Sequence, residues 1–506
     1  MKEVIKKPTD AKVRVGKDVL ELISSAMYVE PLNAYREYVQ NAADAIDQAR
    51  SDGDLRAGEP GTIDISIDQS NREVRIRDNG AAIPSAEVVD RLLAIGGSGK
   101  RGTQARGFRG VGRLASLGYC QRLTFRSRAQ GAKEVTEITW DGRRLRSALA
   151  DTKSNDLADV VAQIVDVRHL PTDGVPDRFF EVVIAGIARQ RGDRLLDEAA
   201  VTAYLRQVAP LSFADDFSAA GTIVEALEAA APIAELRISI NDAEPLSRPH
   251  RDFIDLGSTN SQIQEIEIIE VPGIDGGLAA LAWFAHHEYK GAIPVGELVK
   301  GVRVRIGNIQ IGDHRILEDI FPETRFNSWT VGEVHIFDRR IVPNGRRDAF
   351  EASAHHANLV NHLSPVGRDV ARRCRTSSGL RSKLREFELA SQEVEERLNL
   401  VRQGAMTPTV RDAELGRIGQ IIAKMRAIAK TDIIPDARRD AMMDDVESAE
   451  EKVAQLTGEA GVDPLEMVEE NKRGAYRDVI GLIYECSSNR TAAKALVDRI
   501  LQKLAA

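Results

Sequence analysis

The chain has 506 residues and a formal net charge of -8, with 43% hydrophobic and 29% charged residues. These values are typical of a soluble protein of about three domains, and the negative charge argues against a protein that coats nucleic acid over its whole surface. No apolar run approaches the ~20 residues of a membrane span, and residues 1–7 lack the apolar core of a secretory signal. The cysteines, Cys120, Cys374 and Cys486, form no Cys-x-x-Cys pair. We therefore expect reduced thiols, neither a disulfide framework nor a zinc site, and a cytoplasmic protein without membrane contact.

The first part of the chain predicts an α+β domain over residues 1–192. Residues 13–50 indicate two helices separated by Pro31. Alternating apolar and polar side chains predict strands, the first two of which form a β-hairpin around a Gln-Ser-Asn turn. These strands are expected at residues 62–68, 72–78, 121–140 and 179–187. A glycine-rich region at residues 96–112 lies between the hairpin and the later strands.

A second α+β region is expected over residues 193–365, opened by a helix near 196–209 and closed by one near 347–363. Its strands are predicted at residues 235–241, 264–271, 278–285, 302–311 and 331–342. From residue 366 to 506 the strand patterns stop, and apolar residues follow heptad spacing in three stretches. We expect an all-α region that pairs with a second copy to form a homodimer; a bundle within one chain is the alternative.

Three polar residues share one face of a predicted helix. Glu37, Asn41 and Asp44 lie at i, i+4 and i+7, and the positions between them are largely apolar, which indicates a packed helix. Two carboxylates and a carboxamide on a packed helix need partners, and a metal ion, a water molecule and a phosphate would suit them. A surface helix with a polar stripe is the alternative for this segment taken alone.

Two further clusters point to a ligand with a flat ring and phosphates. Asp78 ends a hairpin strand, where its carboxylate can accept a hydrogen bond from an exocyclic amine, and Gly80 allows close approach of a ring. Asp-Asn-Gly alone is also a common turn. The glycine-rich region offers backbone N–H groups to an anion, and a helix expected from Val111 adds its positive N-terminal end. Ser98 and Lys100 would add a hydroxyl and an ammonium group, although the order of residues is not that of a Walker A loop.

The order and spacing of these motifs resemble the GHKL (Bergerat-fold) ATPases, the superfamily of gyrase, histidine kinases, MutL and the ninety-kilodalton heat-shock chaperones, which include HtpG. The matching residues are Glu37, Asn41 and Asp44 in the first motif, Asp78, Gly80 and Ile83 in the second, and Gly107, Phe108, Arg109, Gly110, Val111 and Gly112 in the third. The chaperone version is the most similar, since residues 35–47 resemble its Leu-Arg-Glu-Leu-Ile-Ser-Asn-x-x-Asp-Ala-Leu-Asp helix. Residues 301–311 and 340–348 resemble chaperone middle-domain segments, so the resemblance covers roughly residues 15–360.

The resemblance implies an N-terminal α/β-sandwich ATPase domain, a transducer-like middle domain, and hydrolysis of ATP with Mg²⁺. Glu37 would be the catalytic general base, and Asn41 would bind the metal ion. Asp78 would bind the adenine amine beside Gly80 and Ile83. The phosphates would be held by Ser98, Lys100 and the backbone from Gly107 to Gly112. Asp44 either contacts the nucleotide or braces its helix.

The resemblance also implies a catalytic arginine from the middle domain. Arg347 takes the place of the arginine that reaches the γ-phosphate, where it would stabilise developing charge. Lys300 is an alternative for that contact. In the structural alternative, Arg346 and Arg347 cap a helix or pair with Asp348. A catalytic group from another domain would couple hydrolysis to domain closure.

The sequence departs from the chaperone pattern in several places. Only six residues separate Lys100 from Gly107, where the chaperones carry a much longer lid. Arg109 stands where they have a small or uncharged residue and would add a phosphate contact. The threonine next to adenine has no clear counterpart, because Thr172 lies in a Pro-Thr-Asp-Gly context that matches poorly. The region after residue 366 does not resemble the chaperone dimerisation domain.

The function expected from these features is a chaperone-like, ATP-dependent conformational clamp that binds client or partner proteins. The alternative is an ATP-gated, DNA-associated clamp resembling MORC or MutL proteins in genome maintenance or phage defence. A basic stretch at residues 368–385 motivates this alternative, but such stretches are also solvated faces paired with acidic neighbours. A non-hydrolysing ATP sensor is a third hypothesis, against which Glu37 argues. A histidine kinase fits least, because its nucleotide domain follows a phospho-acceptor helix.

Overall fold

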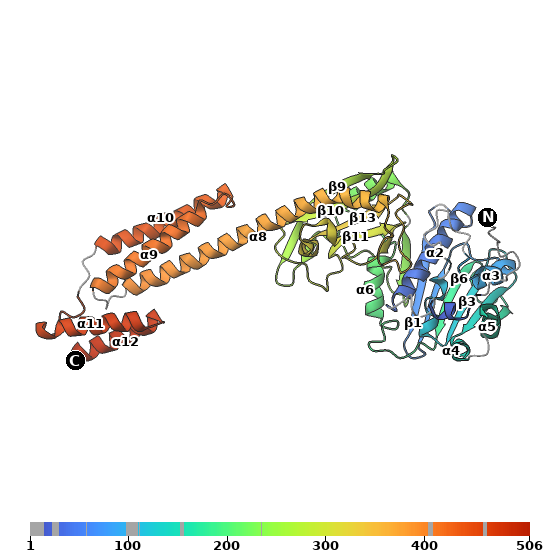
Figure 1. Ribbon diagram of the computed structural model, residues 1–506, viewed down its shortest axis with the longest axis horizontal. Helices are drawn as coiled ribbons and strands as arrows, with labels where there is room; N and C mark the ends of the chain where they lie inside the picture. Colours follow the sequence, from blue (N-terminus) through green and yellow to red (C-terminus); the bar gives the residue numbers. More distant parts are fainter. Residues whose placement is uncertain are drawn as a thin grey trace, which may run out of the picture. The chain divides into compact units, whose positions relative to one another are not determined.

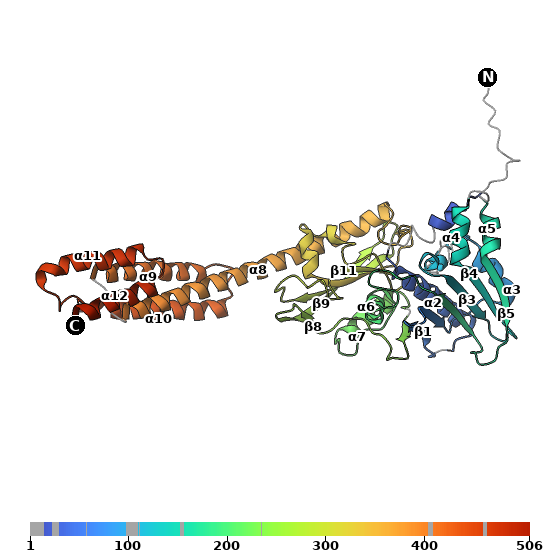
Figure 2. The ribbon, with the colours of Figure 1, turned by 90° about the horizontal axis from the view of Figure 1, so that it is seen from below.

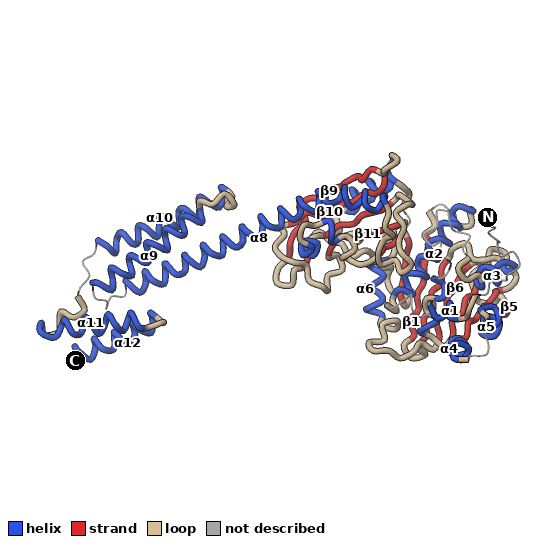
Figure 3. Tube along the Cα trace, viewed as in Figure 1, coloured by secondary structure: helices blue, strands red, loops and turns tan. Residues whose placement is uncertain are grey.

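The computed structural model describes residues 15–22, 30–56, 58–97, 110, 112–151, 156–233, 235–402, 408–458 and 463–505. The chain folds into two compact units, Met1–Ala371 and Arg372–Ala506. Figure 3 shows strands in the first unit, whereas the described part of the second unit is helical. The predicted α+β class and the all-helical C-terminal region are therefore confirmed.

Seven strands of the described residues form the first sheet, in the order β5-β4-β3-β6-β2-β1-β7. The strands are β1 (Gly61–Asp68), β2 (Glu73–Asp78), β3 (Arg122–Arg128), β4 (Val135–Asp141), β5 (Val165–Leu170), β6 (Phe179–Ala185) and β7 (Leu236–Ile240). Neighbouring strands are antiparallel except β1 and β7, which are parallel. The predicted hairpin is confirmed as β1 and β2, with Ile63 opposite Asp78.

Helices lie against this sheet (Figures 1 and 2). They are α1 (Asp18–Glu21), α2 (Asn33–Asp52), α3 (Ser85–Leu93), α4 (Gly142–Ala150) and α5 (Leu157–Ile164). In α2, Tyr35, Val39, Ala42 and Ile46 follow helical spacing and are all buried in the same core as the inward residues of β1 and β2. Burying each larger side chain contributes about 1.5–3 kcal/mol. The packed side of α2 fixes the direction in which its polar residues point.

Six strands of the described residues form the second sheet, in the order β12-β11-β13-β10-β9-β8. They are β8 (Phe253–Asp255), β9 (Asn260–Pro272), β10 (Leu278–His287), β11 (Gly301–Ile306), β12 (Ile309–Ile311) and β13 (Val331–Ile336). Helices α6 (Glu198–Val208) and α7 (Ala220–Ala230) precede them. Ile223 and Leu227 of α7 pack with Trp283 of β10, so the second sheet has its own apolar core.

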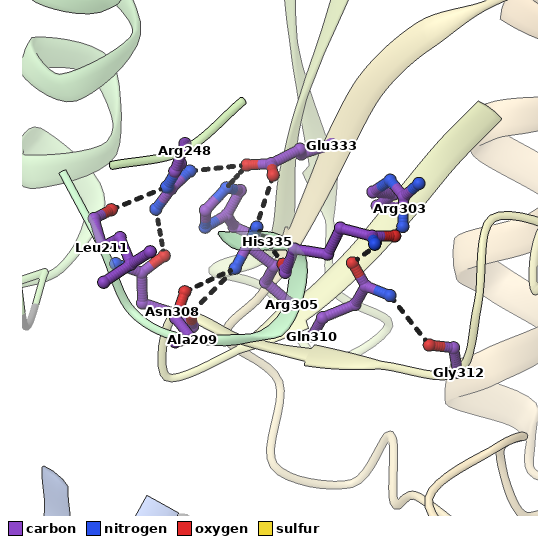
Figure 4. A network of polar contacts seen from close by, with 11 residues as sticks. Ala209, Leu211, Arg248, Arg303, Arg305, Asn308, Gln310, Gly312, Glu333 and His335 are labelled. Atoms are coloured by element: carbon purple, nitrogen blue, oxygen red, sulfur yellow. Dashed lines mark hydrogen bonds and ion pairs between the residues drawn. The ribbon is translucent and has the colours of Figure 1, made fainter. Parts of the chain in front are cut away.

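A buried ionic cluster joins the second sheet to the segment after α6 (Figure 4). Glu333 of β13 is 0% exposed and accepts hydrogen bonds at 2.7 Å from both Arg248 and Arg305. Arg305 also donates to the backbone oxygens of Gln207 at 2.7 Å and Ala209 at 3.3 Å. Burial alone would raise the pKa of Glu333, but the two guanidinium groups outweigh it and hold this pKa well below its usual value.

Two expectations for the first sheet and the segments around it are wrong. The strand near 235–241 was expected in the second region, yet β7 joins the first sheet beside β1, because its pairing partner lies far away in the sequence and leaves no local signal. The helix expected from Val111 is absent from the described residues, which instead form two short 3₁₀ turns at Gly112–Leu114 and Leu117–Tyr119. The hydroxyl of Tyr38 donates to the Arg113 carbonyl at 3.1 Å, an acceptor that an α-helix would use, and this contact accompanies the tighter turns.

The described part of the second unit consists of helices. Its helices include the C-terminal part of α8 (Ala354–Arg402), followed by α9 (Pro408–Ala429), α10 (Asp436–Gly458), α11 (Glu470–Cys486) and α12 (Arg490–Ala505). The expected boundary at residue 366 falls inside α8, so a continuous helix replaces the expected break. Most of the heptad positions are buried within the chain, among them Val394, Leu398, Ile418, Ile422 and Val446. Among the described residues, no helix combines the length and apolar character needed to cross a membrane.

Candidate functional site

The first motif lies on α2, with Glu37 and Asp44 in the protein interior. Glu37 is 6% exposed, Asp44 is also buried, and Asn41 is half-buried between them along the helix. No described residue forms a hydrogen bond with the Asn41 amide. The helix is therefore packed, as predicted, and it presents a carboxylate next to an amide oxygen that is available to a ligand.

The second motif is hydrogen-bonded directly to this helix. The backbone N–H of Ala81 donates to the carbonyl oxygen of Ala45 at 2.9 Å. A Cβ atom on Gly80 would lie 2.7 Å from both the carbonyl carbon and the Cβ of Ala45, so only glycine fits this approach. Ser127 of β3 holds the last residue of the second motif, because its hydroxyl accepts from the N–H of Ile83 at 2.7 Å and donates to the Ile83 carbonyl at 2.9 Å.

Asp78 is a buried carboxyl group at the end of β2. Burial raises its pKa to about 7, while the N–H of Gly80, which donates to Oδ1 at 2.9 Å, and the charge of Arg178 act in the opposite direction. Arg178 also donates to the Asn79 carbonyl at 3.0 Å. Asp78 is therefore poised to accept a hydrogen bond from a ligand amine, an interaction that favours its ionised form.

The third motif is only partly described. Ser98, Lys100, Gly107, Phe108, Arg109 and Val111 lie outside the described residues. Gly110 has a left-handed φ of 70°, and its carbonyl accepts from Arg113 at 3.0 Å. Arg113 also donates to the carbonyl of Ala94 at 3.0 Å, so the end of this motif is tied to the segment after α3. A Cβ atom on Gly112 would lie 2.1 Å from Oε2 of Glu37.

A loop after the second sheet reaches the same face of α2. The Nε atom of Arg347 lies 3.6 Å from Oε1 of Glu37, and its Nη1 donates to the side-chain oxygen of Gln40. The carbonyl oxygen of Arg346 accepts from Nη2 of Arg36 at 3.1 Å, and the same Nη2 lies 3.7 Å from Glu37. The Glu37 carboxylate thus contacts two guanidinium groups from different parts of the chain.

These contacts bear on two alternatives: that Arg347 pairs with Asp348, and that Lys300 takes the place of Arg347. The carboxylate of Asp348 accepts from Asn344 at 2.6 Å, and Asn344 accepts in return from the N–H of Asp348. Arg347 forms its ion pair with Glu37. No described contact joins Lys300 to α2. The geometry therefore favours Arg347 as the cation that accompanies Glu37.

Sequence reasoning missed three residues of this site. Arg36, Gln40 and Ser127 are all buried. Gln40 and Ser127 form hydrogen bonds with the predicted residues Arg347 and Ile83, and Arg36 forms one with Arg346, the neighbour of Arg347. Arg36 and Gln40 had a signal, since a long polar side chain on a packed helix needs a partner. Ser127 had none, because it lies in an ordinary strand pattern.

The residues present fit an adenine nucleotide and a magnesium ion. Gly80 and Gly112 let the second and third motifs approach α2 closely, and Asp78 supplies a buried acceptor. No cluster of three or more His, Cys, Asp or Glu side chains among the described residues forms a metal cage. Mg²⁺ commonly takes one or two protein ligands and completes its octahedron with phosphates and water. The Asn41 amide oxygen could serve as a single protein ligand of this kind.

Comparison with known proteins finds a family match for the part of the chain that holds the three motifs. Residues 29–166 match the family model of histidine kinase-, DNA gyrase B-, and HSP90-like ATPases. These residues form a GHKL-type ATPase domain, and the resemblance expected from the three motifs is confirmed.

The similar proteins include the chaperone protein HtpG of several bacteria. That of Klebsiella pneumoniae is 30% identical over 148 residues, covering 25% of this chain and 23% of that protein. That of Salmonella paratyphi A is 29% identical over 158 residues, covering 28% and 25%. That of Escherichia coli K12 is 30% identical over 148 residues, covering 25% and 23%. The alignments thus span about a quarter of the length of these relatives.

Proposed function

We propose that this chain is a chaperone-like ATPase, an ATP-dependent conformational clamp that acts on client or partner proteins in the cytoplasm. The observation that carries the proposal is the contact between Glu37 and Arg347, whose Oε1 and Nε atoms lie 3.6 Å apart. Glu37 belongs to the ATPase helix and Arg347 to a loop beyond the second sheet. A site completed from two regions of the chain makes turnover depend on how those regions are arranged.

In the proposed reaction, the oxygen of the attacking water forms a bond to the γ-phosphorus while Glu37 accepts a proton from that water. The bond from that phosphorus to the β–γ bridging oxygen breaks, which gives ADP and phosphate. Arg347 stabilises the charge that develops on the γ-phosphoryl oxygens. Asn41 would hold Mg²⁺, which would supply positive charge to the nucleotide phosphates.

The remaining residues hold the nucleotide. Asp78 accepts a hydrogen bond from the adenine amine, and Gly80 and Ile83 belong to the loop that borders the ring. Asp44 either contacts the nucleotide or braces α2. The phosphates are held by Ser98, Lys100, Gly107, Phe108, Arg109, Gly110, Val111 and Gly112.

The test of the enzymatic proposal compares the wild-type chain with Glu37→Gln and with Glu244→Gln, which changes an exposed glutamate. We expect Mg²⁺-dependent ATP hydrolysis that falls at least ~100-fold in Glu37→Gln, with ATP affinity retained. Glu244→Gln should hydrolyse ATP as the wild type does. A wild-type protein without hydrolysis, or hydrolysis that persists in Glu37→Gln, would overturn the proposal.

The clamp is proposed to be a homodimer through the helical region. Several large apolar side chains of this region are exposed in the single chain, namely Leu389, Met467, Val479, Leu482 and Leu496, and they support a further interface. Light scattering with and without a non-hydrolysable ATP analogue measures the mass directly. A monomeric mass in both states would remove the dimeric clamp.

The DNA-associated alternative rests on the basic stretch of α8. Many of its side chains already interact within the chain, since Arg372, Arg373 and Arg375 have partners and Lys383 pairs with Glu386 at 3.0 Å. This favours a paired, solvated face. Fluorescence anisotropy with duplex DNA distinguishes the two functions: tight binding that weakens steeply with salt would favour the DNA clamp.

A further inference from the structure

We propose that Gln40 is a positioning residue for Arg347: its side-chain oxygen holds the guanidinium group beside Glu37, ready to act on the γ-phosphoryl group. The inference rests on the proposed ATPase function and adds a residue to its machinery. Gln40 was not part of any predicted motif, and it contacts Arg347 rather than the nucleotide itself.

Gln40 occupies a constrained place on α2. It is 1% exposed and lies one helical turn after Glu37, so both side chains lie on the same side of the helix. A buried carboxamide must find hydrogen-bond partners. The partner of its oxygen is Nη1 of Arg347, a residue 307 positions away in the sequence. The HSP90-type helix that residues 35–47 resemble has serine at this position.

The backbone around Arg347 is fixed independently of Gln40. The N–H of Arg347 donates to the Asn344 carbonyl at 3.2 Å, and its carbonyl accepts from the N–H of Gly312 at 2.8 Å. The adjacent Arg346 carbonyl accepts from Arg36 at 3.1 Å. Arg347 also has a left-handed φ of 58°, a conformation that costs free energy for a non-glycine residue and persists where surrounding contacts impose it.

With the backbone fixed, the direction of the guanidinium group is decided by its side-chain contacts. Glu37 is one of these contacts, but in the proposed reaction its carboxylate must act on water. Gln40 is a neutral acceptor, so it orients the guanidinium group without cancelling its charge. A neutral side chain that orients the guanidinium group and leaves its charge intact is suited to positioning an arginine for transition-state stabilisation.

A double-mutant cycle tests this role. The variants are Gln40→Met, which keeps the length of the side chain and removes the acceptor, Arg347→Met, and the double variant. Gln48→Met is the matched control, since Gln48 is an exposed glutamine on the same helix. We expect Gln40→Met to lower kcat ~10-fold with ATP KM changed less than twofold. Arg347→Met should lower kcat ~100-fold or more, and the double variant should be no slower than Arg347→Met.

The outcomes separate the two proposals. Hydrolysis in the wild type with independent, multiplicative effects of Gln40→Met and Arg347→Met would overturn the positioning role and leave the ATPase proposal standing. Unchanged kcat in Gln40→Met would do the same. A wild-type protein without hydrolysis would overturn both. The melting temperature of each variant is measured in parallel, so that a loss of kcat from unfolding is recognised.

Discussion

Gly112 and Glu37 approach each other so closely that a methyl group on Gly112 would lie 2.1 Å from Oε2 of the glutamate. The two residues come from the third and first motifs, 75 positions apart in the sequence. The glycine therefore sets the space in which the candidate base lies. The consequences of filling that space can be measured.

Gly112→Ala should lower kcat ~10- to 100-fold while the melting temperature changes little. The added methyl meets the end of a side chain and not backbone, so we expect the carboxylate to move and the fold to persist. Steady-state ATPase kinetics with thermal unfolding of the same samples provides the measurement. Gly221→Ala, which places a methyl in open space on α7, is the control. Unchanged kcat in Gly112→Ala would show that the carboxylate is not confined by this glycine.

Gly80→Ala should act on stability instead. Here the methyl would lie 2.7 Å from the carbonyl carbon of Ala45, within the backbone of α2, which cannot move aside. Overpacking of this kind costs about 1–3 kcal/mol, so we expect a melting temperature several degrees lower together with weaker ATP binding. Gly221→Ala again serves as the control. A variant as stable as the wild type would indicate that the loop after β2 shifts without cost.

Asp78→Asn should stabilise the protein without nucleotide at pH 8 but not at pH 5. Burial raises the pKa of Asp78 from 3.8 to about 7, so the folded state holds a proton that the unfolded state releases between these values. The free energy of unfolding therefore falls as pH rises from about 4 to 7, and above pH 7 the ionised carboxylate costs roughly 4 kcal/mol. Asparagine retains the acceptor for Gly80 and does not ionise.

The measurement for Asp78→Asn is thermal unfolding at both pH values, followed by ATP binding at pH 8, which the variant should lose. Asp64→Asn changes an exposed carboxylate of β1 and should alter neither property. Wild-type ATP affinity should rise as pH increases through about 7, because the adenine amine donates best to the ionised form. An equal melting temperature for wild type and Asp78→Asn at pH 8 would contradict the account of burial.

Glu333→Gln should destabilise the first unit by about 3–5 kcal/mol, because it leaves Arg248 and Arg305 buried with too little negative charge. The low pKa of Glu333 means that the wild type has this stabilisation above about pH 4.5 and loses it as pH falls below that value. The difference between the two proteins should therefore shrink on acidification. Thermal unfolding at pH 7 and pH 4 measures it, with Glu244→Gln as the control.

The sequence was sufficient for those parts of the site whose signals are local. Glu37, Asn41 and Asp44 lie on one helix, and Asp78 ends a hairpin strand, so periodicity and turn residues predicted their setting. The contacts of Gln40 and Arg36 with the Arg346–Arg347 loop were not predictable in this way. They join residues about 310 positions apart, and no local pattern specifies a partner at that distance.

Burial of charge was the other property that pattern reasoning did not recover. Arg303 and Arg305 alternate with valines in β11, a pattern typical of a strand with one solvated face. In the structure both faces are covered, and Arg305 is buried against Glu333 and the end of α6. The partner that makes this burial tolerable lies on a neighbouring strand and becomes visible only with the sheet order.

The pairing of β7 with β1 means that no single cut separates the ATPase region cleanly from the rest of the chain. The chain leaves the first sheet after β6, builds α6 and α7, returns to add β7, and only then forms the second sheet. A fragment ending at residue 192 would expose the β1 edge, with unpaired backbone groups that invite aggregation. Residues 193–240 thus tie the two sheets together, and any exchange of this ATPase module between proteins, in the laboratory or in evolution, must carry them along.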